Sequence, residues 1–158
     1  MDRFHRAATA LALDDQPTEA LPMLAAQALA DGIDTPALAE LAACSRHDVP
    51  ADLRDLFLQA LHELSVPVPD RETAGLRRMN GTAEALLNGT RPPYEATYDL
   101  YWSACALPPS PARTKLITDL VWLWSSWEDR PADRPSIEQD MRRAAEEWLA
   151  TDSGRMCP

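Results

Sequence analysis

The chain has 158 residues and a formal net charge of −10, with 46% apolar and 25% charged side chains. This length and composition suit a globular protein made of one domain or of two small half-domains. The negative charge opposes contact with nucleic-acid phosphates, and no apolar run approaches the roughly 18 residues that cross a bilayer, so we expect neither a nucleic-acid partner nor a membrane.

The negative charge is concentrated in the first part of the chain. Residues 1–68 carry 4 basic and 11 acidic side chains, a net charge of −7, whereas residues 69–158 carry 11 and 14, a net charge of −3. A surface of this sign attracts a basic partner. The same charge can also serve only to keep the protein in solution, and the sequence leaves both readings open.

The predicted elements are all helical. No segment has the alternation of a β-strand, whereas helical periodicity recurs, and caps and prolines divide it into about eight helices. The first four are expected over residues 2–13, from residue 18 to a stop at Gly32, over 35–44, and around 53–64. Thr35 as N-cap and Pro36 at the first helical position mark the third start most clearly.

A connector with two prolines follows these four helices. The segment from Ser65 to Asp70 favours an extended conformation, because Pro67 and Pro69 restrict their neighbours. We therefore divide the chain into an acidic helical half at 1–68 and an aromatic-rich helical half at 69–151. A disordered tail is expected at 152–158.

The second half predicts four more helices, over residues 70–87, 93–106 and 111–127 and along an apolar stripe at 137–149. A loop with two Asp-Arg-Pro triplets, residues 129–135, precedes the last one. The sequence thus predicts an all-α fold, a compact bundle of about eight helices in two packed halves.

Part of this pattern is similar to known sequences. The stretch Leu29-Ala-Asp-Gly-Ile-Asp-Thr-Pro-Ala-Leu-Ala-Glu-Leu-Ala42, followed by Asp52-Leu-Arg-Asp-Leu-Phe57 and Leu61-His-Glu-Leu64, resembles small acidic helical proteins predicted in actinobacterial genomes. The resemblance covers mainly residues 29–70, with a looser Trp-Glu-Asp-Arg-Pro match at 127–131. It implies a helical fold and a bacterial source. It carries no shared function and transfers no catalytic residue.

The three cysteines, Cys44, Cys105 and Cys157, include no CxxC pair, and their odd number leaves no complete disulfide set. Cys44 and Cys105 fall within apolar helical patterns, where cysteine acts as a small hydrophobic residue. The apolar run at residues 7–13 is too short and too soon followed by acids to be a signal peptide. We therefore expect a reducing, cytoplasmic location.

Three acids stand out in the first half. Asp48, Asp52 and Asp55 are spaced so that a helix aligns them, and such carboxylates could hold Mg²⁺ or Ca²⁺. Acids at a helix start are, however, also favoured by the helix dipole. The three histidines are scattered and form no HExxH motif. We therefore expect no metal and no cofactor, and regard the three acids as candidate partner-binding residues.

Aromatic residues are concentrated in the second half, where all five Trp and all three Tyr lie between residues 94 and 148. Five residues of helix 93–106 share one face: Tyr94, Tyr98, Tyr101, Trp102 and Cys105. Together with the apolar stripe of helix 111–127, this face can form an aromatic core. It can also line a pocket between the two helices, since Tyr and Trp join apolar area to a polar tip.

Trp122 differs from these residues because it lies opposite the apolar stripe of its helix. An outward tryptophan on a polar face is a candidate interface residue. The alternative is that it packs against the first half of the chain.

Two functions are consistent with these features. The first is a non-catalytic module that binds a basic protein, as an immunity or antitoxin-like protein or a regulatory adaptor. The second is a small-molecule binding protein or minor enzyme that uses the Tyr/Trp face. The sequence has no phosphate-binding Gly-rich loop and no GxSxG motif. We therefore favour the first and expect no catalytic residue.

Overall fold

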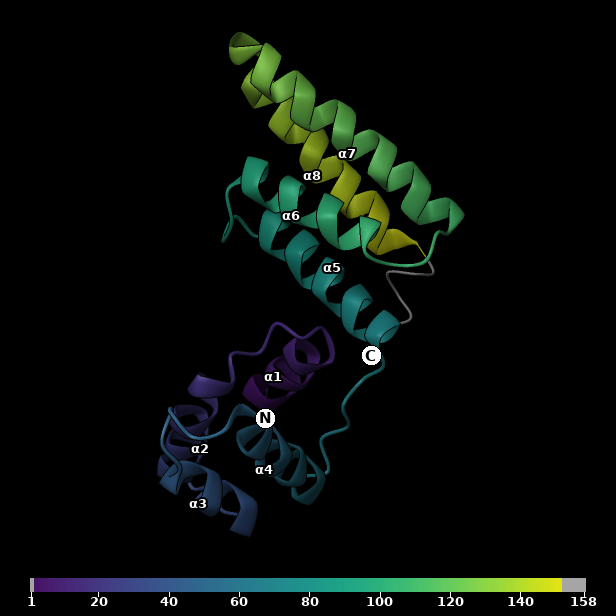
Figure 1. Cartoon of the computed structure of the whole chain (residues 1–158). Helices are drawn as coiled ribbons and strands as arrows, with labels where there is room; N and C mark the ends of the chain where they lie inside the picture. The colour runs from purple at the N-terminus through teal and green to yellow at the C-terminus, as the bar shows by residue number, and fades with distance from the viewer. Residues whose placement is uncertain (1, 152–158) are drawn as a thin grey trace. The chain divides into compact units, whose positions relative to one another are not determined.

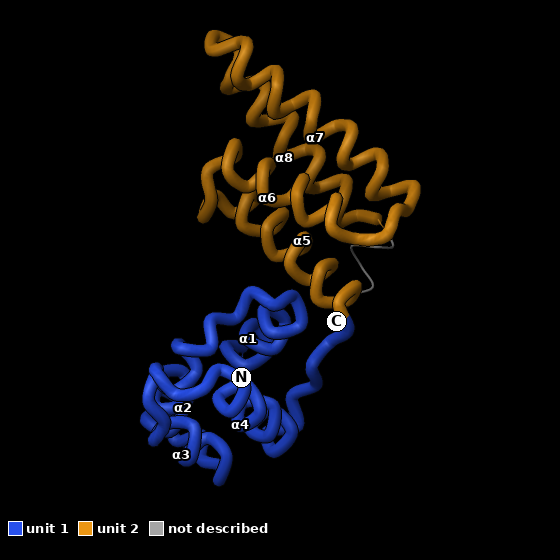
Figure 2. Tube along the Cα trace, in the orientation of Figure 1, with its two compact units in different colours: residues 1–70 blue, residues 71–158 orange. Residues whose placement is uncertain are grey.

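The computed structural model describes residues 2–151, and the all-α prediction is confirmed there: this part of the chain contains eight α-helices and no β-strand. The chain divides into two compact units, Met1–Asp70 and Arg71–Pro158, shown separately coloured in Figure 2. The change of unit falls two residues beyond the expected boundary, after the Pro67–Pro69 connector. The predicted disordered tail, 152–158, lies outside the described residues.

The N-terminal unit contains four α-helices and one short 3₁₀ helix (Figure 1). They are α1 (Asp2–Ala12), η1 (Thr18–Ala20), α2 (Leu21–Ala30), α3 (Pro36–Ala43) and α4 (Pro50–Glu63). The side chain of Thr35 accepts a hydrogen bond from the Leu38 amide at 3.3 Å and caps α3 as expected. Gly32, at φ +81°, ends α2 in the left-handed conformation that glycine adopts without strain.

The core of this unit is built from leucine, alanine and phenylalanine. Phe4 of α1, Leu21 of α2, Leu38 of α3 and Phe57 of α4 are all fully buried. Glu63 ties the end of α4 to the start of α3, because one of its carboxylate oxygens accepts a hydrogen bond from the Ala37 amide at 3.0 Å. This bond is the main cause of a lowered pKa at Glu63.

The C-terminal unit is a four-helix bundle of α5 (Arg71–Leu87), α6 (Pro93–Cys105), α7 (Pro111–Asp129) and α8 (Arg134–Ala150). Each helix packs against the next, and α5 also packs against α8, which closes the bundle. A 3₁₀ turn, η2 (Pro131–Asp133), joins α7 to α8. The core includes Leu100, Leu120, Met141 and Trp148, each at most 2% exposed.

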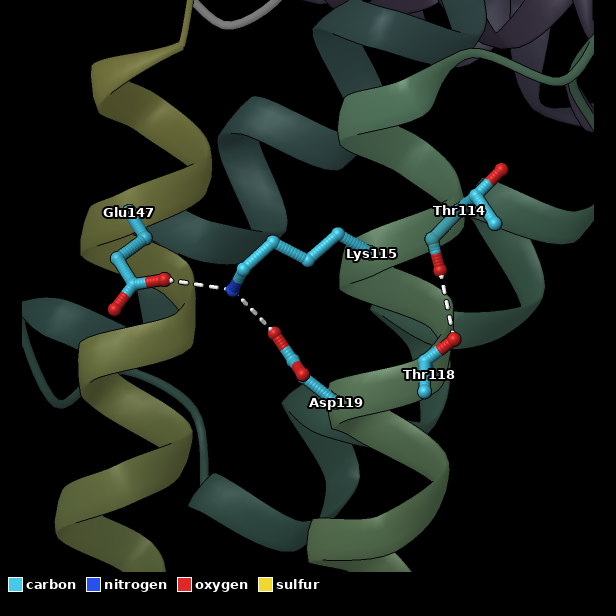
Figure 3. Close-up of polar contacts among 5 residues, drawn as sticks. All are labelled: Thr114, Lys115, Thr118, Asp119 and Glu147. Atoms are coloured by element: carbon cyan, nitrogen blue, oxygen red, sulfur yellow. Dashed lines mark hydrogen bonds and ion pairs between the residues drawn. The ribbon is translucent and has the colours of Figure 1, made fainter.

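Polar contacts join the helices of this bundle at several points. Lys115 Nζ on α7 donates to Asp119 Oδ2 at 2.7 Å and to Glu147 Oε2 of α8 at 3.0 Å (Figure 3). The two carboxylates raise the pKa of the Lys115 ammonium group. At the start of α7, the buried side chain of Arg113 donates from Nη2 to Glu72 Oε1 of α5 at 3.1 Å.

Within the described residues, no helix is both long and apolar enough to cross a membrane.

Candidate functional site

The acids predicted as partner-binding residues line a concave site of about 460 Å³ in the N-terminal unit. It lies between the last turn of α3 and the first turns of α4. Its lining residues are Glu40, Cys44, Asp48, Asp52, Leu53, Asp55, Leu56 and Gln59. We call this site the acidic concavity. All three predicted acids contribute to it, and α3 adds a fourth carboxylate, Glu40.

A short turn between the two helices sets the geometry of the acidic concavity. Asp48 Oδ2 accepts a hydrogen bond from the Ser45 amide at 2.8 Å, and the Asp48 amide donates to the Ser45 carbonyl at 3.0 Å. Pro50 then begins α4, with Asp52 in its first turn and Asp55 one turn later. The helix dipole favours a carboxylate in the first turn, where Asp52 lies. Asp48 is therefore held by the backbone, whereas Asp52 and Asp55 are free to contact a ligand.

The negative charge of the acidic concavity is not balanced by any basic side chain among its lining residues. No arginine, lysine or histidine is among its lining residues. Within residues 2–151, Glu40, Asp52 and Asp55 form no ion pair. Buried Leu53 and half-buried Leu56 supply an apolar floor beneath these carboxylates. The arrangement is suited to a ligand that carries both positive charge and apolar surface.

The thiol of Cys44 responds to this environment. Burial raises its pKa, and the negative charges of Asp48, Glu40 and Asp52 raise it further. Cys44 Sγ lies 3.4 Å from the carbonyl oxygen of Glu40, to which its hydrogen can be donated. A thiol with a raised pKa stays protonated at neutral pH and is a poor nucleophile.

This environment predicts that Asp52→Asn makes Cys44 more reactive. Removing one nearby negative charge lowers the thiol pKa, so more thiolate is present at a given pH and the rate–pH curve moves to lower pH. In a Cys105→Ser/Cys157→Ser background, alkylation of Cys44 by a neutral maleimide at pH 8 should accelerate about twofold. Asp34→Asn, an exposed acid outside the concavity, should leave the rate unchanged. An unchanged rate in Asp52→Asn would show that its carboxylate does not influence the thiol.

The same three acids are not arranged as metal ligands. Within residues 2–151, no group of three or more His, Cys, Asp or Glu side chains is arranged to hold a metal ion. His47 and His62 are exposed, and His47 Nε2 accepts a hydrogen bond from Arg46 Nε at 3.2 Å. Although Asp48, Asp52 and Asp55 are evenly spaced along the chain, their carboxylates are not grouped around a position for a metal ion.

The aromatic residues of α6 lie at the margin of the core of the C-terminal unit: Tyr98 and Trp102 are exposed, whereas Tyr94 and Tyr101 are half-buried and Tyr101 packs against the core. The side of α6 that enters the bundle carries Ala96, Thr97, Leu100 and Ala104, all buried. On the bundle side, α6 packs mainly against α5 and α7. Trp102 is 53% exposed and Cys105 is also exposed, so Cys105 does not act as a core residue either.

The rings of α6 instead pack beside Trp124 of α7, at centroid distances of 5.0 Å from Tyr98, 6.1 Å from Tyr101 and 6.4 Å from Tyr94. Trp124 Nε1 donates to the Tyr94 hydroxyl at 2.7 Å, and that hydroxyl donates to Glu128 Oε1 at 2.7 Å. The bond to Glu128 is the main cause of a raised pKa at Tyr94. We call Tyr94, Tyr98, Tyr101, Trp102 and Trp124 the aromatic surface.

Trp122 is also on the surface of the C-terminal unit. The residue is 59% exposed, and the guanidinium carbon of Arg130 lies 5.6 Å from the centroid of its ring. Such a contact contributes about 0.5–1 kcal/mol at an exposed position. Trp122 and the three acids belong to different units.

No protein-family model, curated protein or solved structure matches the chain. A function for either surface therefore rests on its own geometry and charge.

Sequence reasoning missed one carboxylate of the acidic concavity, Glu40. Glu40 precedes Asp48 by eight residues and lies on another helix. Only the turn at residues 44–49 brings it opposite α4. The one available signal is that Glu40 and Cys44 are four residues apart, and so share a face of α3 and its cap.

The exposure of Trp122 predicts a small effect on stability. Trp122→Ala should change the free energy of unfolding by less than about 1 kcal/mol, because little apolar area is returned to water and no core cavity forms. Urea denaturation followed by far-UV circular dichroism measures this. A loss of about 3 kcal/mol or more would mean that Trp122 is core and would remove it as a candidate interface residue.

Proposed function

We propose that this protein is a non-catalytic module that binds a basic protein partner through the acidic concavity. The observation that carries the proposal is the convergence of four carboxylates, which form no ion pair within residues 2–151, on an apolar floor with no cation among the lining residues. The net charge of −7 over residues 1–68 supports it, because a field of that sign steers a basic partner towards this unit.

A lysine or arginine side chain matches the acidic concavity in both of its parts. The methylene stem can lie against Leu53 and Leu56, while the charged head reaches Asp52, Asp55 or Glu40. Hydrogen bonds between ionised groups are roughly twice as strong as neutral ones. The partner would be a basic protein that this chain neutralises, as an immunity or antitoxin-like protein does, or one that it regulates as an adaptor.

Several features favour binding over catalysis. The raised pKa of Cys44 keeps its thiol protonated, and no histidine lines the acidic concavity to activate it. Cys44 and Cys105 are both free thiols, which suits a partner in the reducing cytoplasm. The negative charge disfavours polyphosphate ligands, so we do not assign a nucleic-acid or membrane partner.

The aromatic surface gives a second candidate function, the binding of a small molecule between α6 and α7. The exposure of Tyr98 and Trp102 favours it. Against it, the rings of Tyr98 and Tyr101 pack directly beside that of Trp124, at centroid distances of 5.0 and 6.1 Å. We therefore place this function second.

The proposal is tested with a defined basic probe. A labelled 12-residue peptide with the repeat lysine-glycine-leucine is titrated with the full chain. In a parallel titration, the peptide has glutamate in place of each lysine. We expect micromolar binding of the basic peptide at 150 mM salt, weaker binding at 500 mM salt, and none of the acidic peptide. Equal binding of both peptides, or no binding of either, would contradict the proposal.

A further inference from the structure

Trp102 offers an aromatic ring to solvent in a fixed orientation. It is 53% exposed, and its ring centroid lies 6.1 Å from that of Tyr98 and 5.2 Å from that of Tyr101, both in edge contacts. Tyr98 is itself 38% exposed. A ring that is already held in place loses little conformational entropy when a ligand contacts it. This part of α6 is therefore pre-organised for binding.

Two other tryptophans of the same unit have an arginine guanidinium over the ring. The guanidinium carbon of Arg134 lies 3.8 Å from the Trp127 ring centroid, and that of Arg130 lies 5.6 Å from the Trp122 ring centroid. Within residues 2–151, no arginine or lysine lies over Trp102. Trp102 is thus an exposed ring without the guanidinium contact that Trp122 and Trp127 have.

A carboxylate completes the surface around Trp102. Glu95 precedes Trp102 by seven residues, and Tyr98 lies between them, so the three side chains follow one line along α6. Glu95 is exposed and forms no ion pair with the described residues, whereas Asp99 is paired with Arg91. At 1.5 Å per residue, Glu95 and Trp102 are about 10 Å apart along the helix axis. The line therefore carries an aromatic contact and a free negative charge.

We propose that Glu95, Tyr98 and Trp102 form a docking site for an arginine-bearing segment of a basic protein. One guanidinium stacks on Trp102, and a second basic side chain pairs with Glu95. A separation of about 10 Å matches basic residues three apart in a polyproline II segment, which has three residues per turn and so places both side chains on one face. Guanidinium is preferred over ammonium because it is planar and more weakly hydrated. The inference rests on the proposed function in assigning a basic partner, but uses a different surface in the other unit.

The experiment uses the full chain with Asp52→Asn/Asp55→Asn, so that the acidic concavity does not contribute. The probe is an eight-residue peptide in the polyproline II conformation with two arginines three apart, compared with a lysine analogue and a neutral citrulline analogue. The readout is the indole N–H signals of the five tryptophans in ¹H–¹⁵N NMR spectra. The Trp102 signal is assigned by its loss in Trp102→Leu, and Trp122 serves as an internal reference.

We expect the arginine peptide to shift the Trp102 indole signal and to bind about fivefold more tightly than the lysine peptide. The citrulline peptide should not bind. Glu95→Gln should weaken arginine binding about threefold, while Glu84→Gln, an exposed acid on α5, should not. Trp102→Leu should abolish binding; Trp102→Phe, which keeps a weaker ring, should reduce it.

Equal binding of the citrulline or lysine peptide would overturn this inference, and so would a shift at Trp122 without one at Trp102. The two proposals fail in different ways. If the acidic concavity has no role, Asp52→Asn/Asp55→Asn leaves the binding of the 12-residue lysine peptide unchanged. If the docking site on α6 has no role, Trp102→Leu and Glu95→Gln leave the binding of the arginine peptide unchanged.

Discussion

Trp148→Ala is expected to lower the free energy of unfolding by about 3–5 kcal/mol, the usual cost of removing a large buried aromatic side chain. Trp148 lies on α8 in the core of the C-terminal unit and is only 2% exposed. Its Nε1 donates a hydrogen bond to Asn80 Oδ1 of α5 at 2.9 Å. Truncation opens a cavity between the two helices and also removes a buried polar partner.

Two further variants make this prediction sharper. Trp148→Phe keeps most of the apolar volume and loses the bond to Asn80, so its cost should fall between that of Trp148→Ala and zero. Trp122→Ala removes the same side-chain type from an exposed site, and should cost less than about 1 kcal/mol. Urea denaturation followed by circular dichroism compares all three. Similar losses for Trp148→Ala and Trp122→Ala would contradict the placement of these residues.

Asp52→Asn/Asp55→Asn is expected to weaken binding of the basic 12-residue peptide by at least about tenfold, which corresponds to about 1.4 kcal/mol. Both side chains are exposed, line the acidic concavity and have no ion pair within the described residues. Their replacement removes charge without breaking an observed contact. Asp48 is left unchanged, since its carboxylate holds the turn through the Ser45 amide.

The matched control for this pair is Glu19→Gln/Asp34→Asn. Both residues are exposed acids of the same unit, outside the acidic concavity, and both double variants have the same net charge of −8. Fluorescence anisotropy at 150 mM salt measures the affinity of each. If the two double variants weaken binding equally, the peptide responds to overall charge and not to the concavity.

The helices were largely predictable from the sequence because their ends carry local signals. Thr35 and Ser110 each cap a helix through the side chain, with proline at the next position. These contacts involve residues three apart, so no tertiary information is needed to foresee them. Asp48, Asp52 and Asp55 were also predictable as a group, since their spacing alone places them along one helix start.

The buried side of α6 was not predictable by the same reasoning. Its aromatic residues form a conspicuous face, but the bundle buries the less apolar side at Ala96, Leu100 and Ala104. That choice depends on how α6 packs against α5 and α7, which periodicity along one helix does not report. The burial of Arg113 is a similar case, because its partner Glu72 lies on another helix, 41 residues away.

The most direct test of the proposed function is to map where the basic peptide binds, by ¹H–¹⁵N NMR of the full chain during a titration. A basic side chain seated in the acidic concavity should shift the backbone amide signals of Cys44, Asp52, Asp55 and Gln59 with one common dissociation constant. These shifts should disappear in Asp52→Asn/Asp55→Asn and persist in Glu19→Gln/Asp34→Asn. Saturable binding that leaves those four signals in place would contradict a partner site between α3 and α4.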